Sequence, residues 1–272
     1  MTIQLLFLIP LFAIAHGVIR KIDPQIVGGR FARSGEVPYQ VSLQRIRTEE
    51  HFCGGVIISQ YYILTAAHCL ENVDVNTISA NVGLIDLREP HAVHRIESSY
   101  IHEDYNVDGQ WRNDIALVKL QSPIKYSPLV SPVILTKNQT IPAGTEVVVS
   151  GFGRLSFQGE KTTRLYVADI EIVNQDYCRD VYRRFRNIYD TQICANDETE
   201  EKGSCEYDSG GPVTQGEPGL EELIGLGSWG YKCGDTTYPA VYTHVPSYFQ
   251  WVIDNTEDEK NKNNTEDDNT ED

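Results

Sequence analysis

The sequence predicts an all-β protein, and three observations support this prediction. Between Pro38 and Pro246 the apolar residues gather in short runs that are rich in Val and Ile. Glycine, proline, asparagine and aspartate separate these runs and favour turns between them. Stretches with a helical pattern are few. Short apolar runs at such intervals are typical of closed barrels or sandwiches.

Each expected strand combines β-branched residues with neighbouring turn signals. The expected strands lie within residues 56–58, 62–64, 115–118, 147–149 and 223–226. Two helices are also expected. One covers residues 175–186, and the other is a terminal helix over residues 247–253 with Ser247 as its N-cap.

The first residues of the chain are typical of a secretory signal peptide, which we place at residues 1–15. The apolar run from Leu5 to Ala15 is too short to span a bilayer, and Ala13-Ile14-Ala15 fits a cleavage site. A buried N-terminal strand or helix is the alternative. No later stretch is long and apolar enough for a transmembrane helix. We therefore expect a secreted, extracellular protein that does not associate with membranes.

The six cysteines agree with export. They show no CxxC pair or Cys/His cluster of the kind that binds zinc. In an oxidising compartment an even number of cysteines favours structural disulfides. Their spacing alone does not choose among the possible pairings. The residues concerned are Cys53, Cys69, Cys178, Cys194, Cys205 and Cys233.

The charge of the chain is unevenly distributed. The net charge of −16 argues against nucleic acid as a partner, because phosphates select basic surfaces. Residues 254–272 contain nine acidic residues against two lysines, so this segment carries −7. It repeats Asn-Thr-Glu-Asp from Asn255, Asn264 and Asn269. Such a segment cannot bury a core, and we expect an acidic disordered tail that either binds a partner or keeps the protein soluble.

Three local motifs point to nucleophilic catalysis. His68 lies among small residues next to a cysteine, Asp114 enters an apolar strand, and Ser209 stands between an aspartate and two glycines. Alone, each has an ordinary structural explanation: a buried histidine, a strand cap and a surface turn. Together they follow the chain order His, Asp, Ser of one class of serine proteases. This order predicts a catalytic triad.

With these residues in place, the chain resembles a secreted serine endopeptidase of the trypsin/chymotrypsin family. The resemblance covers residues 26–253 and implies two six-stranded antiparallel β-barrels with the active-site cleft between them, followed by a C-terminal helix. It also implies the disulfides Cys53–Cys69, Cys178–Cys194 and Cys205–Cys233. The motifs that carry it are Ile26-Val27-Gly28-Gly29, Phe52-Cys53-Gly54-Gly55, Thr65-Ala66-Ala67-His68-Cys69, Asp114-Ile115-Ala116-Leu117, Asp208-Ser209-Gly210-Gly211-Pro212 and Ser228-Trp229-Gly230.

The resemblance implies a role for each site residue. Ser209 would attack the scissile carbonyl, His68 would transfer the proton, and Asp114 would orient the imidazole. The N–H groups of Tyr207 and Ser209 would form the oxyanion hole. Substrate would pair as an extra strand along Ser228-Trp229-Gly230.

The resemblance also implies a zymogen. Residues 16–25 would form a short activation peptide, and its removal would free the amine of Ile26 to pair with Asp208. The residue before Ile26 is Gln25, whereas zymogens of this family are usually cut after Arg or Lys. Activation therefore needs either a non-tryptic protease or a second trimming step after a cut at Arg20 or Lys21.

The residues of the expected specificity pocket favour large apolar side chains. Gly203 occupies the pocket base, where a trypsin-like enzyme needs a carboxylate to pair with a buried cation. Ser204 follows it, and Gly230 and Ala240 form the walls. We expect a chymotrypsin-like preference for Phe or Tyr, with Leu and Met also accepted. A tight elastase-like pocket is less consistent with Gly230.

Tyr207 departs from the family pattern, which has glycine at this position of the oxyanion hole. A bulky residue is strained if the position requires φ > 0, and a flipped peptide would remove one donor. The alternative function is therefore a weakly active or inactive secreted homologue that acts by binding.

The remaining expectations concern modification and partners. Asn138 and Asn263 begin N-glycosylation sequons, so the protein is expected to be a glycoprotein. Leu84 and Ile85 stand where the family's calcium loop would have an acidic ligand, so no metal and no cofactor are expected. We expect a monomer whose partners are protein or peptide substrates, protein protease inhibitors and an activating protease.

Overall fold

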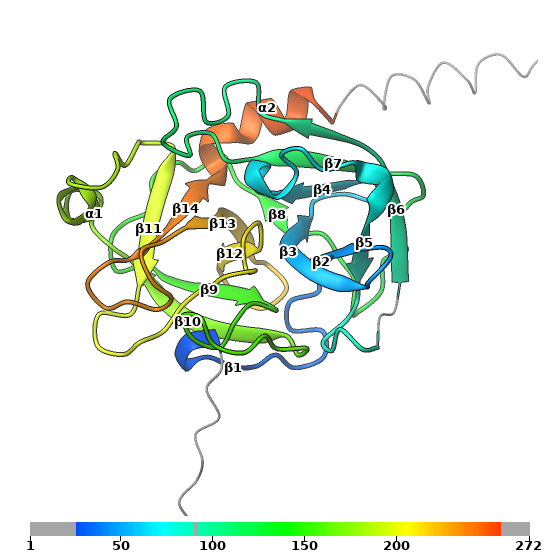
Figure 1. Ribbon diagram of the computed structural model, residues 1–272, viewed down its shortest axis with the longest axis horizontal. Coiled ribbons are helices and arrows are strands. Elements are labelled where there is room, and N and C mark those ends of the chain that lie inside the picture. The colour runs from blue at the N-terminus through cyan, green and yellow to red at the C-terminus, as the bar shows by residue number, and fades with distance from the viewer. Residues whose placement is uncertain (1–25, 90–91, 257–272) are drawn as a thin grey trace, which may run out of the picture.

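In the computed structural model, which describes residues 26–89 and 92–256, the first half of the chain forms a closed barrel of six antiparallel strands (Figure 1). Around the barrel the strands follow the order β2-β3-β4-β7-β6-β5. Their bounds are β2 Gln40–Arg45, β3 Glu50–Ile57, β4 Tyr62–Thr65, β5 Ile78–Val82, β6 Ala92–Ile101 and β7 Ala116–Leu120.

The second half forms another six-stranded antiparallel barrel, in the order β9-β10-β11-β14-β13-β12, which closes because β12 pairs with β9. The bounds are β9 Glu146–Gly151, β10 Tyr166–Ile172, β11 Gln192–Asn196, β12 Pro212–Gln215, β13 Glu222–Trp229 and β14 Ala240–His244. Two short strands attach to its outside. β1 (Arg30–Phe31) pairs with β10, and β8 (Ile134–Leu135) pairs with β13 in parallel.

These barrels confirm the predicted all-β fold with two six-stranded antiparallel barrels. The expected strands overlap β3, β4, β7, β9 and β13; β3 ends one residue before the expected end, and β7 begins one residue after the expected start. Residues of β4 and β7 such as Ile63, Leu64 and Leu117 have no exposed surface. Side chains on one face of each strand fill the barrel interior. Those on the other face of β4 and β7 are largely buried as well, so these strands are continuous apolar runs rather than alternating ones.

The helices differ from the prediction at their ends. α1 (Gln175–Tyr182) is capped by Asn174, whose side chain accepts from two backbone N–H groups. The helix ends four residues before the expected end. Beyond it the carbonyl of Tyr182 accepts from the N–H groups of Phe185 and Arg186, which forms a turn. The terminal helix α2 (Phe249–Asp254) is present, but the N-cap prediction was wrong. Ser247 lies inside a preceding 3-10 turn, Val245–Tyr248, where its hydroxyl bonds to the ring of His244.

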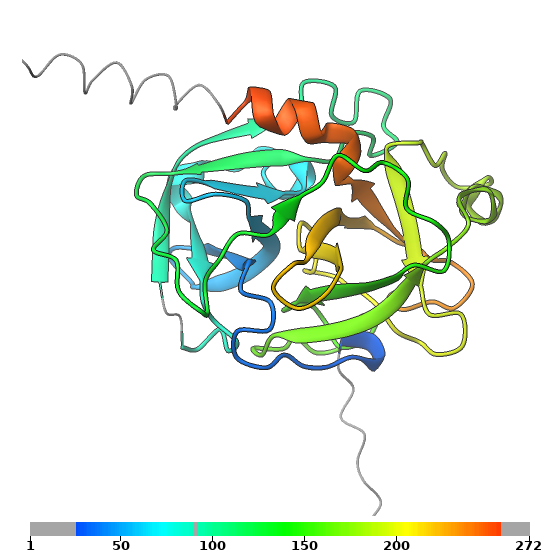
Figure 2. The same ribbon diagram turned by 180° about the vertical axis from the view of Figure 1, so that it is seen from behind.

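The two barrels lie side by side, and both views place α2 at the edge of the molecule (Figures 1 and 2). Tyr248 and Val252, from the end of the chain, pack into the core that contains the first barrel. The C-terminal segment therefore ties the second barrel to the first.

Glycines permit close contact between the barrels. A Cβ added at Gly54 in β3 would lie 2.8 Å from the backbone of Gly211, so no larger residue fits there without a shift. Gly210 has φ +77° and a Cβ there would lie 2.2 Å from Thr65 Oγ1. The N–H of Gly54 also donates to the carbonyl of Ser209 at 2.8 Å. The loop that carries Ser209 thus rests directly on the first barrel.

The structure contains the disulfides Cys53–Cys69, Cys178–Cys194 and Cys205–Cys233, the pairing that the resemblance implies. Within the described ranges, no helix has the length and apolar character needed to cross a membrane. The expected signal peptide, the activation peptide, the second sequon at Asn263 and most of the acidic tail lie outside the described residues.

Candidate active site

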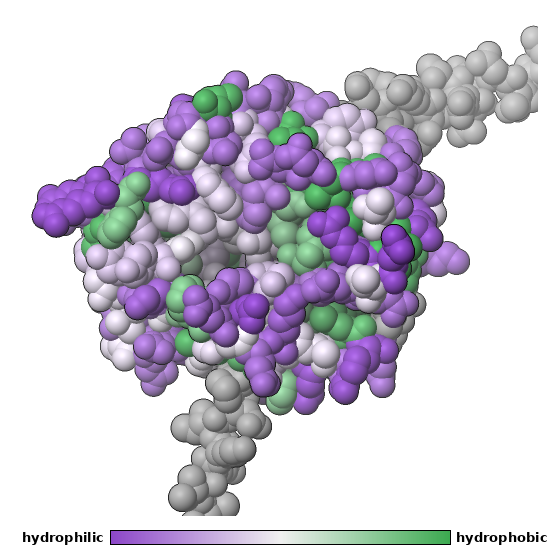
Figure 3. Space-filling view, in the orientation of Figure 1, coloured by the Kyte–Doolittle hydropathy of each residue, from purple (hydrophilic) through white to green (hydrophobic). Residues whose placement is uncertain are grey.

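A cavity of about 440 Å³ lies between the barrels. Figure 3 shows the face on which the molecule is hollowed near its middle. His68 from the first barrel and Ser209 from the second both line this cavity. The cavity is also lined by residues of both barrels and their loops, among them Trp111, Arg186, Ser204, Glu206, Ser228, Trp229, Gly230, Lys232 and Ala240.

Asp114 is buried and accepts three hydrogen bonds. Its Oδ1 accepts from the backbone N–H of His68 at 2.9 Å, and its Oδ2 accepts from His68 Nδ1 at 2.8 Å. The hydroxyl of Ser228 donates to Oδ2 at 2.6 Å. A carboxylate can only accept, so Nδ1 of His68 carries the proton and Nε2 is left with a lone pair. The imidazole is therefore held in the tautomer that can accept a proton at Nε2.

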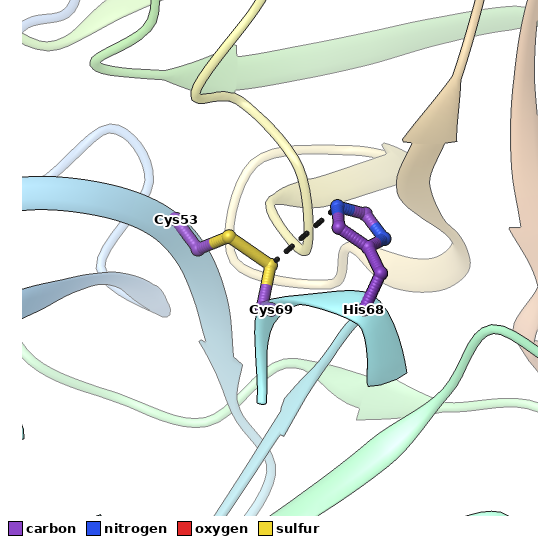
Figure 4. Close-up of side chains that lie close together, drawn as sticks. All are labelled: Cys53, His68 and Cys69. Atoms are coloured by element: carbon purple, nitrogen blue, oxygen red, sulfur yellow. Dashed lines mark hydrogen bonds between the residues drawn. A yellow bond between two sulfur atoms is a disulfide. The ribbon is translucent and has the colours of Figure 1, made fainter. Parts of the chain in front are cut away.

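His68 is fixed in position from two further directions. Its ring packs against the ring of Trp111, with centroids 4.8 Å apart. Figure 4 shows the ring beside the Cys53–Cys69 disulfide, and Nε2 lies 3.8 Å from Cys69 Sγ. Because both sulfurs belong to the disulfide and carry no proton, this is a packing contact.

Ser209 lies across the cavity from His68 in the turn that precedes β12. Among the described residues, no hydrogen bond joins its hydroxyl to His68 Nε2. In unliganded enzymes such bonds are often long and tighten only when substrate binds. The carbonyl of Ser209 is held by Gly54, so the loop position is fixed from the backbone.

Tyr207 has φ +76°, so its backbone is in the left-handed conformation. This is the case in which a bulky residue at this position is strained. The peptide before it is held by the N–H of Arg154, which donates to the carbonyl of Glu206 at 2.9 Å. In a trans peptide the N–H points opposite to the carbonyl, so the N–H of Tyr207 is directed away from Arg154. Within the described chain, neither this N–H nor that of Ser209 donates to a protein acceptor. Both donors therefore remain available for a ligand.

The peptide after Tyr207 is held by His51, which the sequence did not single out. The Nε2 of His51 lies 3.0 Å from the carbonyl of Tyr207, and its Nδ1 lies 2.8 Å from the hydroxyl of Ser42. Because a carbonyl only accepts, Nε2 carries the proton and Nδ1 accepts from Ser42. Burial lowers the pKa of His51 to about 4, which keeps the ring neutral. Nothing around His51 in the sequence distinguishes it from any histidine in a strand.

Asp208 is buried with an unusual electrostatic environment. Its carboxylate accepts from the N–H groups of Cys205 at 2.8 Å and Gly153 at 2.7 Å. Burial raises its pKa to about 7, although these hydrogen bonds act in the opposite direction. In the part of the chain that the structure describes, no cation pairs with it. The carbonyl of Val27, next to Ile26, accepts from the N–H of Gly203 at 3.0 Å, so the start of the domain lies against the neighbouring loop.

The expected pocket residues gather at one end of the cavity. Ser204, Gly230 and Ala240 line it, and Ser204 bonds to the hydroxyl of Tyr242 at 2.7 Å. A Cβ added at Gly230 would lie 3.7 Å from Ala240 Cα, so these two residues face each other. Gly203, expected at the pocket base, is buried next to Ser204 in sequence but is not itself among the lining residues, and it adds no charge there.

Two groups of residues have possible ligand atoms close enough together to be considered as metal sites. Cys53, His68 and Cys69 form one, and Cys205, Glu206 and Cys233 form the other. In both groups the sulfurs are joined in disulfides and cannot act as thiolates. Neither donor set fits a metal ion.

The sequon at Asn138 lies in an exposed segment, where both Asn138 and Thr140 are on the surface. The Asn138 side chain accepts from the N–H of Thr140 at 3.0 Å. The side chain is therefore accessible from solvent.

A sequence model of the trypsin family, described as Trypsin, matches residues 26–252. Chymotrypsin-2 of Vespa crabro is 38% identical over 85% of this chain and 99% of its own length. Trypsin epsilon of Drosophila erecta and Hypodermin-B of Hypoderma lineatum are each 37% identical over 88% of this chain and 90% of their own.

Proposed function

Because the chain belongs to the trypsin family of serine proteases, we propose that its peptide-bond hydrolysis runs through Ser209, His68 and Asp114. The family assigns a serine endopeptidase, a hydrolase whose substrates are proteins. The observation that supports the residue assignment is the hydrogen-bonded pair of Asp114 and His68, whose Nε2 is free of a proton in the cavity that Ser209 lines.

The proposed reaction follows from these positions. Ser209 Oγ attacks the scissile carbonyl while His68 Nε2 takes the hydroxyl proton. The imidazolium is stabilised by Asp114, which holds Nδ1–H. The N–H groups of Tyr207 and Ser209 bind the oxyanion. His68 then gives its proton to the leaving amine, and water attacks the acyl-enzyme by the same route in reverse.

The test is covalent labelling after the chain has been cut to expose Ile26. A fluorophosphonate should label Ser209, and Ser209→Ala should abolish the label. Ser204→Ala, also in the cavity, is the matched control and should be labelled. If the cut wild-type protein takes no label, the enzyme mechanism proposed here is wrong and a non-catalytic binding homologue remains. Tyr207 at φ +76° is the observation that keeps this second function in view.

We also propose that the protein is made as a zymogen. A freed amine at Ile26 would supply the cation that Asp208 lacks, and a buried ammonium–carboxylate pair requires both members. Asp208 directly precedes Ser209, so the pair would fix the oxyanion loop. The peptide bond after Gln25 is the proposed cut, by a non-tryptic protease or by trimming. Edman sequencing of the natural active form should begin at Ile26.

The proposed preference at P1, the residue whose carbonyl is attacked, is for Phe or Tyr, with Leu and Met accepted. It is supported by the neutral Gly203 at the pocket base and the small walls Gly230 and Ala240. The names of the relatives include both trypsin and chymotrypsin, so they do not decide the preference. Substrates that differ only in P1 (Phe, Leu, Ala, Arg) test it. Efficient cleavage after Arg would contradict it.

Processing and partners complete the proposal. Residues 1–15 are proposed as a signal peptide, which directs a monomeric protein to the extracellular space. The part of residues 254–272 that follows α2 and its closing turn is proposed as a disordered tail. Asn138 and Asn263 are proposed as glycosylated positions, and protein inhibitors of proteases as further partners. Mass spectrometry of the secreted protein before and after glycosidase treatment tests the processing and glycosylation sites.

A further inference from the structure

We propose that Lys161 and Arg154 are positioning residues that hold Tyr207 in the conformation the oxyanion hole requires. This inference rests on the proposed function, because it assigns Tyr207 N–H to the oxyanion. It explains how a tyrosine can occupy a position at φ +76°, which side chains other than glycine adopt only with strain.

Two cations lie over the Tyr207 ring. Lys161 Nζ is 4.0 Å from the ring centroid, and the guanidinium carbon of Arg154 is 5.4 Å from it. Both distances lie within the range of cation–π attraction, which is of the same order as the strain of a single left-handed residue. The ring contacts can therefore offset the backbone strain.

The two cations are held as a unit. Arg154 and Lys161 face each other in an isolated antiparallel bridge at the two ends of one loop. Lys161 also pairs with Glu50 at 2.5 Å, which connects this loop to the first barrel. The Arg154 N–H holds the peptide before Tyr207, and the His51 ring holds the peptide after it. The loop from Arg154 to Lys161 therefore holds the Tyr207 ring with its side chains, and its backbone orients the Tyr207 N–H.

A double-mutant cycle tests the proposal. Lys161→Met and Arg154→Met, alone and together, are made in the Tyr207 protein and in the Tyr207→Gly variant. In the Tyr207 protein each change should lower kcat by roughly 3- to 10-fold, the size of one cation–π contact, with KM nearly unchanged. The affinity of a peptide boronic acid, which occupies the oxyanion hole, should fall in parallel.

In the Tyr207→Gly background the same changes should have no effect, because no ring remains to be held. Equal losses in both backgrounds would show that the two residues only stabilise their loop, and would overturn the proposal. Lys137→Met is the matched control, because Lys137 lies 4.9 Å over the ring of Phe249 away from the site. It should leave kcat unchanged.

A readout that does not need catalysis separates this proposal from the proposed function. Thermal unfolding of Ser209→Ala proteins should give the same coupling, with Lys161→Met lowering Tm more when Tyr207 is present than in the Tyr207→Gly background, because the pair with Glu50 is lost in both. If wild-type protein is catalytically silent but the Tm coupling is found, the contact is real and the enzyme mechanism is wrong. If the Tm coupling is absent, the positioning role is wrong whatever the activity.

A second, independent observation concerns Arg186, and the geometry points to a subsite for an acidic side chain of the substrate. The guanidinium carbon lies 5.6 Å from the ring centroid of Trp111 and 5.1 Å from that of Trp229. One terminal nitrogen has no exposed surface, and no acceptor for it exists among the described residues. A buried N–H without a partner is costly. Arg186 also lines the cavity, so a small rotation of its guanidinium would bring this N–H to a carboxylate bound there.

The place of Arg186 identifies the part of the substrate concerned. Trp229 ends β13, the proposed edge for substrate pairing, and Trp111 packs on His68. Both indoles therefore lie on the acyl side of the scissile bond, toward the residues P2 to P4 that precede P1. Two acidic residues line the cavity. Glu206 accepts from the N–H of Gln158, and Asp208 accepts from the N–H groups of Gly153 and Cys205.

Paired substrates with Glu or Gln at P2, P3 or P4 and a common P1 test this subsite. At one of the three positions Glu should raise kcat/KM by about 10-fold over Gln. Arg186→Gln should abolish the difference, and Arg184→Gln, at an exposed neighbour, should preserve it. Calorimetric binding of the same peptides to Ser209→Ala gives the comparison without turnover. No Glu–Gln difference at any position, or one that survives Arg186→Gln, would overturn the assignment.

Discussion

The two barrels contribute halves of the site that differ in how completely they are satisfied. The first barrel supplies Asp114 and His68, which are already hydrogen-bonded to each other, and Asp114 also accepts from Ser228. The second supplies the loop of Tyr207, Asp208 and Ser209, which combines a left-handed tyrosine with a buried carboxylate that has no cation partner among the described residues. The half proposed to transfer the proton is therefore preformed, whereas the half proposed to bind the oxyanion depends on added interactions.

The largest effect is expected from a substitution in the preformed pair of Asp114 and His68. Asp114→Asn keeps the shape of the side chain but can donate to His68 Nδ1, which places the ring proton on Nε2. Without a base at Nε2, kcat should fall by about 10⁴-fold. Steady-state kinetics of the activated protein measure this loss. Asp104→Asn, at an exposed neighbour, should have normal kcat; a loss below tenfold for Asp114→Asn would show that the pair is not the proton relay.

A smaller loss is expected from Asp208→Asn, which breaks the dependent half. The amide cannot form an ion pair with the amine of Ile26, so the oxyanion loop should lose its anchor. We expect kcat to fall by about 10²- to 10³-fold, the range for loss of an oxyanion donor. The imidazole geometry should be untouched, so the imidazole NMR signals of His68 should stay as in wild type. Full activity of the variant would contradict the activation proposal.

The uncut chain should respond to pH through the same carboxyl. Because burial raises the pKa of Asp208 to about 7, the folded state holds this proton while the unfolded state has lost it. The free energy of unfolding should therefore fall as pH rises from about 4 to 7, by about 1.4 kcal/mol for each unit of pKa difference at most. His51 and His244, whose pKa values burial lowers to about 4, act in the opposite direction below pH 6.5.

The contribution of Asp208 is consequently the difference between the uncut wild type and uncut Asp208→Asn. Urea unfolding at pH 5 and pH 8 should give the wild type a smaller stability relative to the variant at pH 8. After cleavage before Ile26 this difference should shrink or reverse, because the amine stabilises the ionised carboxylate. An unchanged difference after the cut would argue against the ion pair.

The smallest effect is expected from a hydrogen bond that the second barrel donates to the first. Ser228→Ala removes one of three hydrogen bonds to Asp114, donated from the second barrel at 2.6 Å. The two bonds to His68 remain, so kcat should fall by no more than about 10- to 100-fold, the range for one hydrogen bond to a charged group. Thr243→Ala, which removes a bond to the Asp114 carbonyl, is a control that should affect stability more than kcat.

Much of the fold and the main motifs could be predicted because they are written in contiguous residues. His68, Asp114 and Ser209 each stand in a recognisable local pattern, and the barrel strands are apolar runs. The contacts that support the site could not be predicted in this way. His51 reaches Tyr207 across 156 positions in the sequence, and the Lys161–Glu50 pair spans 111. Such contacts depend on how the barrels meet, which no local pattern encodes.

The N-cap prediction failed because another turn precedes the helix. Ser247 has the residue type and position of a helix cap, but the chain first makes a 3-10 turn in which Pro246 fixes the backbone. The hydroxyl then finds the ring of His244 instead of a helix N–H. These contacts join residues no more than three apart, so a local turn that the cap pattern did not take into account decided the structure.

The close approach of Gly54 and Gly211 has a consequence for how this protease can change. At that point two backbones meet without room for one methyl group. The seam between the barrels therefore tolerates almost no variation, while the surrounding loops with Tyr207, Lys161 and Arg186 can be exchanged without moving it. We expect new specificity to arise from substitutions at the rim of the cleft, because the backbone contact beside Ser209 leaves no room for a side chain.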